Sequence, residues 1–263
     1  MPVSDSFSDE YDKTGKALDK ALVPRPWKGT VARLGALPAS FGDWPSGELA
    51  GASMAKLRQK LGDTRERFSL DDRKHLSDCT QEAMRWCQKT LILLAKVQGR
   101  SQKGRQAGRE LVSRWFADAN TDEAELDRIV DALQAGFKKI LAVLGSGRLV
   151  LTDHPQARGS TLASSEAFVF TAREPVDVVY IEDAFFSANN VLKGLKNWTR
   201  ILVHELSHRE LATVDKFYAW QGIKPVSGGF PAADALVNAE SWASFCADAA
   251  GALTDSDRQA ALQ

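Results

Sequence analysis

The sequence contains little histidine and cysteine, and it has no long apolar run. Its 263 residues include 3 Cys and 4 His. An odd number of cysteines argues against a disulfide framework, so we expect Cys79, Cys87 and Cys246 to be reduced thiols. No run of about 20 apolar residues occurs, and we therefore expect no membrane span. The formal net charge is zero, which favours neither nucleic acid nor an anionic membrane as a partner.

We also expect no ordinary signal peptide at the N-terminus. Residues 1–10 are polar and acidic, without the basic segment and apolar core of an ordinary signal peptide. We expect secretion by a route that does not use such a peptide, with a cytoplasmic location as the alternative. That route would bring the chain into contact with a delivery or inhibitor protein as a partner.

Proline and glycine are concentrated near the N-terminus. Pro24, Pro26, Pro38 and Pro45 fall in this part of the chain, together with several glycines. Because both residue types interrupt regular elements, residues 1–70 are expected to form an irregular extension. Residues 71–263 are expected to form one domain.

From residue 69 onward the pattern is mostly helical. Apolar residues recur at helical spacing between residues 76 and 94, and again between 126 and 144. Short strands are predicted at 148–152, 167–171 and 177–181. We interpret 99–109 as a basic loop, 110–117 as a short helix, 232–251 as the last helix and 253–263 as a frayed tail. The expected fold class is α+β, mostly helical, with a small sheet.

Two of the four histidines lie in one H-E-x-x-H pentad, which runs from His204 to His208. Apolar residues at three- and four-residue spacing, with no proline or glycine from 195 to 213, predict a helix here. Histidines four residues apart share one helix face, where both imidazoles reach a single metal ion. Such ligands suit catalytic zinc, and Glu205 is placed to take a proton from water. The competing interpretation is a pair of core histidines on a buried helix.

Two histidines leave zinc one protein ligand short, and four carboxylates are candidates for the third. Glu210 points away from the metal if the helix continues past His208. Asp215 follows the expected end of the helix, where a short return would bring it to the metal. Glu240 on the last helix would give a thermolysin-type site, and Asp234 is the fourth candidate.

The residues that follow the pentad resemble the aspzincin metallopeptidases, which include the deuterolysin-like enzymes and the fungal peptidyl-lysine endopeptidases. That family couples H-E-x-x-H to Gly-Thr-x-Asp, and this chain reads Ala-Thr-Val-Asp from Ala212 to Asp215. Tyr218 follows at the position of the family tyrosine. Residues 238–243, Asn-Ala-Glu-Ser-Trp-Ala, are similar to a family pattern on the final helix. The chain departs from the family in having alanine at 212 and a shorter gap before Asp215.

The resemblance implies a zincin-like fold and a zinc endopeptidase that acts on proteins or peptides. It implies that Asp215 completes the ligands of one zinc ion beside the two histidines. It also implies that Tyr218 stabilises the tetrahedral intermediate, with Glu205 as the general base. Glu240 becomes a candidate for binding a basic residue of the substrate.

Three functions are therefore compared. The leading prediction is a zinc endopeptidase. The alternative is an exported antibacterial effector, an amidase or peptidase that acts on cell-wall peptides; the missing signal peptide and the N-terminal extension motivate it. The third is a binding module without catalysis, which the intact pentad does not favour.

Overall fold

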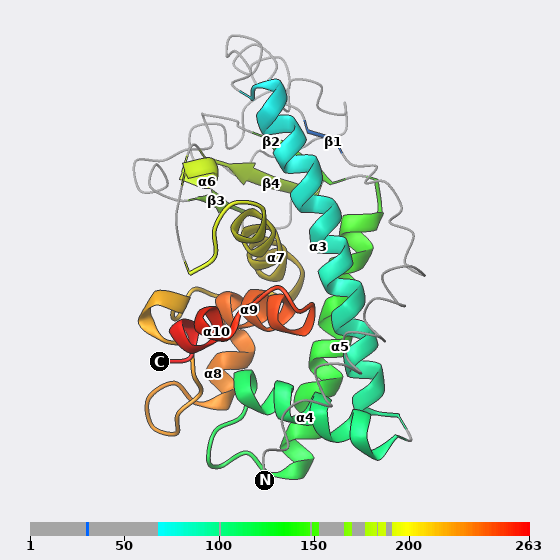
Figure 1. Cartoon of the computed structure of the whole chain (residues 1–263), viewed down its shortest axis with the longest axis vertical. Coiled ribbons are helices and arrows are strands. Elements are labelled where there is room, and N and C mark those ends of the chain that lie inside the picture. Colours follow the sequence, from blue (N-terminus) through cyan, green and yellow to red (C-terminus); the bar gives the residue numbers. More distant parts are fainter. Residues whose placement is uncertain are drawn as a thin grey trace, which may run out of the picture.

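The computed structural model describes most of the chain from residue 68 onward (Figure 1). The described residues are 30–31, 68–99, 101–147, 149–152, 166–169, 177–182, 184–187 and 191–263. Most of the predicted N-terminal extension, 1–70, lies outside these residues. The division into an extension and a domain therefore stays a prediction.

Three helices form one side of the molecule: α3 (Leu70–Val97), α4 (Gln102–Phe116) and α5 (Glu123–Gly145). Helices α3 and α5 run antiparallel along its long axis (Figure 1). Each begins at a side-chain cap, since Ser69 accepts from the Asp72 amide and Asp122 accepts from the Glu125 amide. Their apolar faces meet in one core.

Helix α4 corrects the prediction of a basic loop at 99–109. The helix begins at Gln102, where Ser101 caps it, rather than at residue 110. Glycine in this stretch suggested a loop. Gly108 instead permits close packing, because a Cβ there would lie 2.4 Å from Cγ2 of Val97 on α3.

The sheet is small and mixed, with strand order β1-β2-β4-β3. Its strands are β1 (Thr30–Val31), β2 (Val150–Thr152), β3 (Ala167–Phe168) and β4 (Val178–Ile181). Strands β1, β2 and β4 are parallel, and β3 pairs antiparallel with β4 at one edge. The three predicted strands exist but are shorter than expected. Strand β1 was not predicted, because it lies within the segment that proline and glycine marked as irregular.

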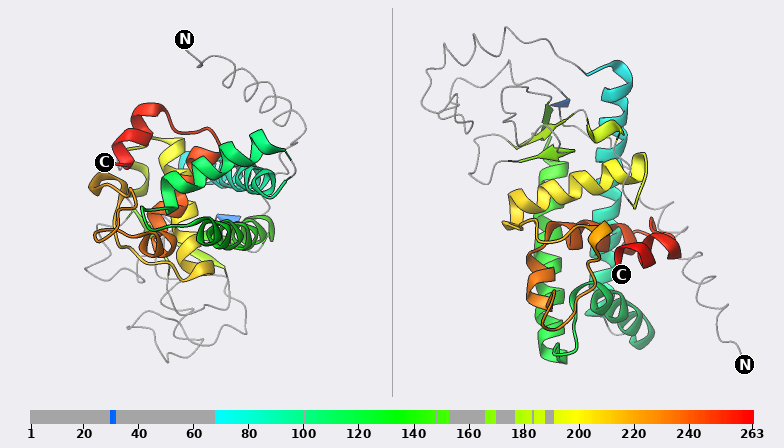
Figure 2. Two further views of the ribbon diagram at one scale, coloured as in Figure 1. Left: turned by 90° about the horizontal axis from the view of Figure 1, so that it is seen from below. Right: turned by 90° about the vertical axis from the view of Figure 1, so that its left-hand side faces the viewer.

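Helix α7 (Leu195–Leu211) lies between the sheet and α9 (Ala239–Ala249), as Figures 1 and 2 show. The short helix α6 (Ala184–Ser187) precedes it. Nine consecutive α7 residues, 199–207, are buried, including charged ones. A helix covered on several sides has no solvent face to carry its polar groups, so they must find partners in the interior.

The C-terminal part differs from the predicted single helix and frayed tail. Residues 232–249 form two helices, α8 (Ala232–Val237) and α9, separated at Asn238, whose backbone is extended. The tail contains α10 (Asp255–Ala261), which Thr254 caps by accepting from the Asp257 amide. Helix α10 is fastened to the 3-10 turn η3 (Ala219–Gln221) nearby, because the Ile223 amide donates to the Ala261 carbonyl over 2.8 Å.

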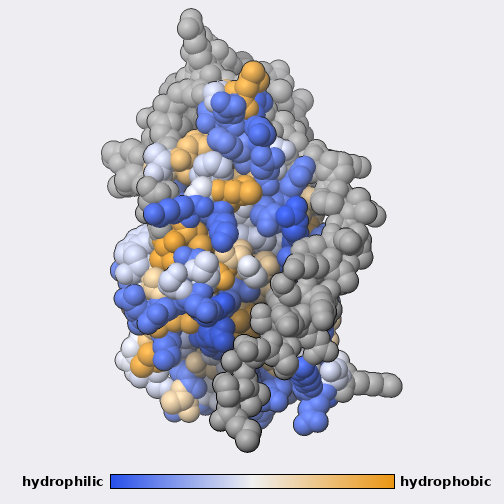
Figure 3. All heavy atoms as spheres, in the orientation of Figure 1, coloured by the Kyte–Doolittle hydropathy of each residue, from blue (hydrophilic) through white to orange (hydrophobic). Residues whose placement is uncertain are grey.

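The expected fold class is confirmed: the chain is mostly helical, with a small sheet beside the pentad helix. The cysteines that the sequence predicted to be reduced are free and buried. Within the described part of the chain, no helix combines the length and apolar character needed to cross a membrane. On the face shown in Figure 3, most of the side chains that lie over α3 are polar. Apolar side chains reach the surface of this face in several small areas.

Candidate metal centre

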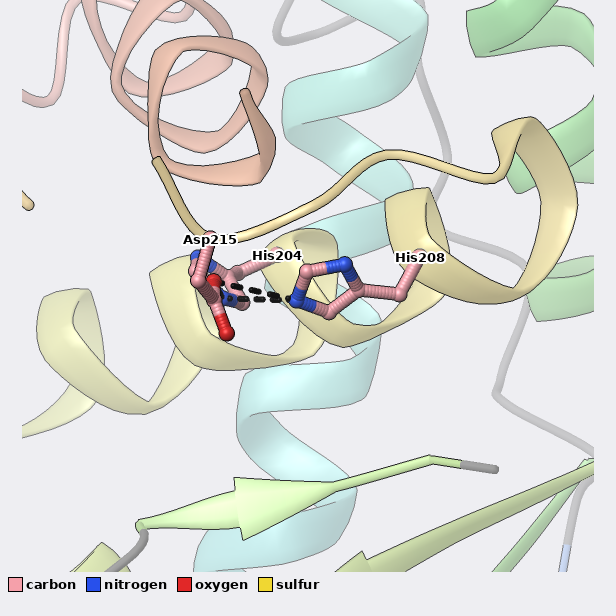
Figure 4. A group of neighbouring side chains, drawn as sticks. All are labelled: His204, His208 and Asp215. Atoms are coloured by element: carbon pink, nitrogen blue, oxygen red, sulfur yellow. Dashed lines mark hydrogen bonds and ion pairs between the residues drawn. The ribbon is translucent and has the colours of Figure 1, made fainter. Parts of the chain in front are cut away.

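Helix α7 supplies two imidazoles whose Nε2 atoms approach each other. His204 and His208 lie one turn apart, and their Nε2 atoms are 3.1 Å from each other (Figure 4). His204 is buried, whereas His208 is only partly covered. The helical spacing predicted this approach, and the structure brings the two rings together as expected.

A tight turn brings Asp215 back to the same point. Helix α7 ends at Leu211, and the next residue, Ala212, has a left-handed backbone with φ of 55° and donates its N–H to the His208 carbonyl. Three residues later, Oδ1 of Asp215 lies 3.0 Å from Nε2 of His204 and 3.2 Å from Nε2 of His208. The structure therefore gathers two histidines of one helix and one aspartate of the segment that follows it (Figure 4).

Asn238, at the break between α8 and α9, fixes this returning segment. Its Oδ1 accepts hydrogen bonds from the amides of Lys216 and Phe217, at 3.0 and 3.1 Å. Its Nδ2 donates to the Phe217 carbonyl over 3.0 Å. The backbone of Val214 also pairs with that of Val237 and Ala239. A buried asparagine thus holds the segment that carries Asp215, a role that the sequence did not predict.

The outer ring nitrogens of both histidines have acceptors. Nδ1 of His204 lies 3.1 Å from Oε2 of Glu240, and Nδ1 of His208 lies 2.7 Å from the Thr213 carbonyl. With a metal ion bound, these acceptors would hold the proton on each Nδ1 and leave the Nε2 lone pair to the ion. The two Nε2 atoms and a carboxylate oxygen lie within 4.8 Å of one another, an arrangement that could hold a metal ion. The donor set of two imidazoles and one carboxylate fits zinc.

Glu240 is held by a buried arginine on α7. Nη1 of Arg200 donates to Oε2 of Glu240 over 2.5 Å, and Nη2 donates to Oε2 of Glu166 over 2.6 Å. Burial works against ionisation of Glu240, but Arg200 and His204 hold the pKa of this carboxyl below its usual range. The sequence did not identify Arg200. The sequence did carry a signal for it: Arg200 lies four residues before His204, so that its charge falls on the same buried face of the helix and needs a partner there.

Protonation of the centre follows from burial and from these contacts. Burial lowers the pKa of His204, but hydrogen bonds to Asp215 and Glu240 outweigh it and raise the pKa to about 10. Burial opposes ionisation of Asp215, yet the two histidines hold its pKa well below its usual range. A cation bound between these atoms takes the place of a proton.

Glu205 lies beside the centre with little solvent contact. It is 6% exposed. Burial raises the pKa of its carboxyl, and the neighbouring histidines only partly oppose this effect. A carboxyl with a raised pKa accepts and releases protons closer to neutral pH than an exposed one.

Tyr218 covers the centre from the returning segment. Its ring lies parallel to that of His204, with centroids 6.1 Å apart and planes 9° apart. Burial raises the pKa of Tyr218, and the charge of Asp215 and a hydrogen bond to it raise the pKa further. The phenol is therefore a hydrogen-bond donor at neutral pH.

The remaining candidate ligands lie elsewhere. Glu210 contacts Nε of Arg209 at 3.3 Å, and Asp234 contacts Nζ of Lys216 at 2.6 Å. Glu240 approaches Nδ1 of His204, the nitrogen that faces away from the second histidine. Among the four carboxylates considered from the sequence, Asp215 is the one found with the Nε2 atoms of both histidines.

Comparison with known proteins gives one informative result. No curated protein matches the chain. The model of the aspzincin M35 family, described as lysine-specific metallo-endopeptidase, matches residues 101–247. This match spans more than half of the chain and includes α7, the returning segment and most of α9. The chain therefore belongs to the aspzincin family and is a zinc-dependent metallo-endopeptidase, a hydrolase of proteins or peptides.

Proposed function

We propose that His204, His208 and Asp215 hold one catalytic zinc ion and that Glu205 is the general base of peptide hydrolysis. The observation that carries the proposal is the convergence of two Nε2 atoms and one carboxylate oxygen within 4.8 Å. When bound, zinc would supply Lewis-acid chemistry, which polarises a carbonyl and lowers the pKa of water. Side chains of the protein carry out the proton transfers and stabilise the oxyanion.

Glu205 moves the protons. It takes one from the attacking water and delivers it to the amine that leaves. Its burial supports this assignment, because the raised pKa allows the same carboxyl to accept a proton and then release it. Its electrostatic interactions with His204, His208 and Asp215 support a position beside the proposed ligands.

Tyr218 donates a hydrogen bond to the oxyanion that develops on the scissile carbonyl. The raised pKa of Tyr218 keeps the phenol protonated, as a donor must be. Its ring lies against His204, and its hydroxyl exchanges the hydrogen bond with Asp215 for one with the substrate.

We assign Glu240 to the orientation of His204 rather than to substrate binding. A carboxylate that accepts the Nδ1 proton fixes the ring and its tautomer and raises its basicity as a ligand. The contact of 3.1 Å and the ion pair with Arg200 support this role.

Replacement of Glu205 by glutamine tests the proposal. Loss of a general base should lower kcat by about 100-fold or more for a peptide substrate. Zinc content should stay near that of the wild type, because Glu205 is not a ligand. Glu210→Gln is the matched control, since Glu210 lies on the same helix and pairs with Arg209, and it should keep its activity. Unchanged cleavage by Glu205→Gln would refute the mechanism.

The alternative of an exported effector uses the same centre on cell-wall peptides. Release of muropeptide fragments without cleavage of unfolded proteins would favour it over a general endopeptidase. Secretion by a route without an ordinary signal peptide, and a delivery or inhibitor partner, remain proposals from the sequence. Fractionation of cells that produce the chain would test the location.

A further inference from the structure

The family description names lysine, and recognition of a lysine ammonium calls for an accessible carboxylate. Glu240 was the candidate on α9. Its side chain is 0% exposed, and Oε2 is occupied by Arg200 and His204. Oε1 is also enclosed and has no hydrogen-bond partner among the described residues. A substrate cation therefore reaches neither oxygen unless the core opens.

Arg200 already supplies the positive charge that a substrate lysine would bring. Its side chain is 4% exposed and bridges Glu240 on α9 to Glu166 beside β3. An ion pair removed from water is costly to separate, because each partner would be left as an isolated buried charge. Lysine would have to displace this arginine to bind Glu240.

The other carboxylates of α8 and α9 are paired in the same way. Asp234 contacts Nζ of Lys216 at 2.6 Å. Asp248 accepts from Trp115 Nε1 at 2.8 Å and from the guanidinium of Arg258 at 2.7 Å. Every acidic side chain on these two helices thus has a cation partner within the chain.

Apolar side chains are exposed on the segment that follows the metal centre. The exposed residues are Val214, Phe217 and Trp220, and Trp220 is 61% exposed. The Trp220 ring stacks on Tyr218, with centroids 4.4 Å apart and planes 4° apart. Tyr218 in turn lies parallel to His204. Trp220 therefore stacks directly on Tyr218, the side chain that covers the candidate zinc ligands.

The backbone that carries Trp220 is fixed, although its side chain is open to solvent. Trp220 lies in η3, between buried Ala219 and the Gln221 side chain, which accepts from the Tyr218 amide over 2.9 Å. The bond from Ile223 to Ala261 secures the turn to α10. An exposed aromatic ring on a fixed turn beside a catalytic centre is a preformed contact for a ligand.

We propose that Trp220 selects an aromatic or large apolar side chain next to the cleaved bond. The inference rests on the proposed endopeptidase function. Stacking on Trp220 supplies the favourable contact, and the carboxylates of α8 and α9 are already paired with cations of the chain, so that these two helices offer no free carboxylate to a substrate lysine.

The test uses the zinc-loaded full chain and peptides that differ only in one residue beside the bond: Phe, Leu, Ala, Lys or Glu, varied on each side. We expect kcat/KM to be at least tenfold higher with Phe than with Lys at one of these positions. Trp220→Ala should lower kcat/KM about fivefold or more for the Phe peptide, through KM, and leave the Ala peptide nearly unchanged. Leu70→Ala, which removes another exposed apolar side chain at the start of α3, is the control.

Binding provides a readout apart from turnover. The Glu205→Gln variant should bind the Phe peptide more tightly than the Lys peptide in calorimetry, and added Trp220→Ala should abolish the difference. A preference for Lys, or a Phe preference that survives Trp220→Ala, would overturn the inference and leave the endopeptidase function intact. If the wild type cleaved no peptide faster than Glu205→Gln does, both the inference and the proposed endopeptidase function would be overturned.

Discussion

At the scale of single residues, the geometry of the candidate metal centre depends on one backbone angle, that of Ala212. Ala212 is the one residue other than glycine with positive φ in the described part of the chain. The left-handed conformation costs an L-residue about 1–2 kcal/mol relative to the ordinary helical one, and glycine adopts it freely. The turn that returns Asp215 to the histidines therefore forms despite local strain.

Ala212→Gly should stabilise the protein. Relief of the left-handed strain is partly offset by the greater freedom of glycine in the unfolded chain, so we expect a gain of about 0.5–1 kcal/mol. For a chain of this size the melting temperature should rise by about 2 °C in a thermal scan. The same replacement at Ala142, an exposed residue within α5, should lower it. A fall at position 212 would contradict the account.

The pentad residues were predictable because a spacing of four places both histidines on one helix face. From residue spacing alone, Asp215 was one of four candidate carboxylates for the third ligand. Spacing could not choose among them, because the position of Asp215 depends on the turn at Ala212. Asn238 and Arg200 were not assigned roles. Their contacts join α7, the returning segment and α9, and a single sequence gives no direct signal of which distant elements meet.

At the scale of elements, the junction of α5, α7 and α9 depends on a glycine inside a helix. A Cβ at Gly136 on α5 would lie 2.5 Å from the indole ring of Trp242 and 3.0 Å from Cδ1 of Leu211. That indole also packs against Phe137, and its Nε1 donates to the Leu236 carbonyl over 2.7 Å. The ring therefore has little room to move.

Gly136→Ala should destabilise the protein even though alanine favours helices. Overpacking against a fixed indole costs about 1–3 kcal/mol. Gly145→Ala, at the end of the same helix, meets no atom within 4 Å and should change stability by less than about 0.5 kcal/mol. Denaturant unfolding of the two variants measures the difference. Equal stability of both would show that the junction can adjust.

Elements with strong apolar periodicity, such as α3 and α5, were predicted well. Helix α4 was predicted too short, because glycine favours loops in general and only tertiary packing explains Gly108. The break at Asn238 was missed because neither proline nor glycine marks it. Its cause is the pairing of this backbone with Val214, which lies in another element.

At the scale of the whole molecule, α7 is enclosed by the sheet, α9 and the two long helices, and it carries most of the candidate site. Its histidines face the returning segment, which Asn238, between α8 and α9, holds by hydrogen bonds. The helical fold class followed from periodicity. The order of the strands did not, because strands of two to four residues carry little pattern.

The central claim is that His204, His208 and Asp215 hold one zinc ion. Crystals of the full chain grown with zinc, measured at the zinc absorption edge, test it most directly. We expect one strong anomalous peak about 2.0–2.2 Å from Nε2 of both histidines and from a carboxylate oxygen of Asp215. The claim would be contradicted if the zinc-containing crystals showed no peak there, or a peak bound by other side chains.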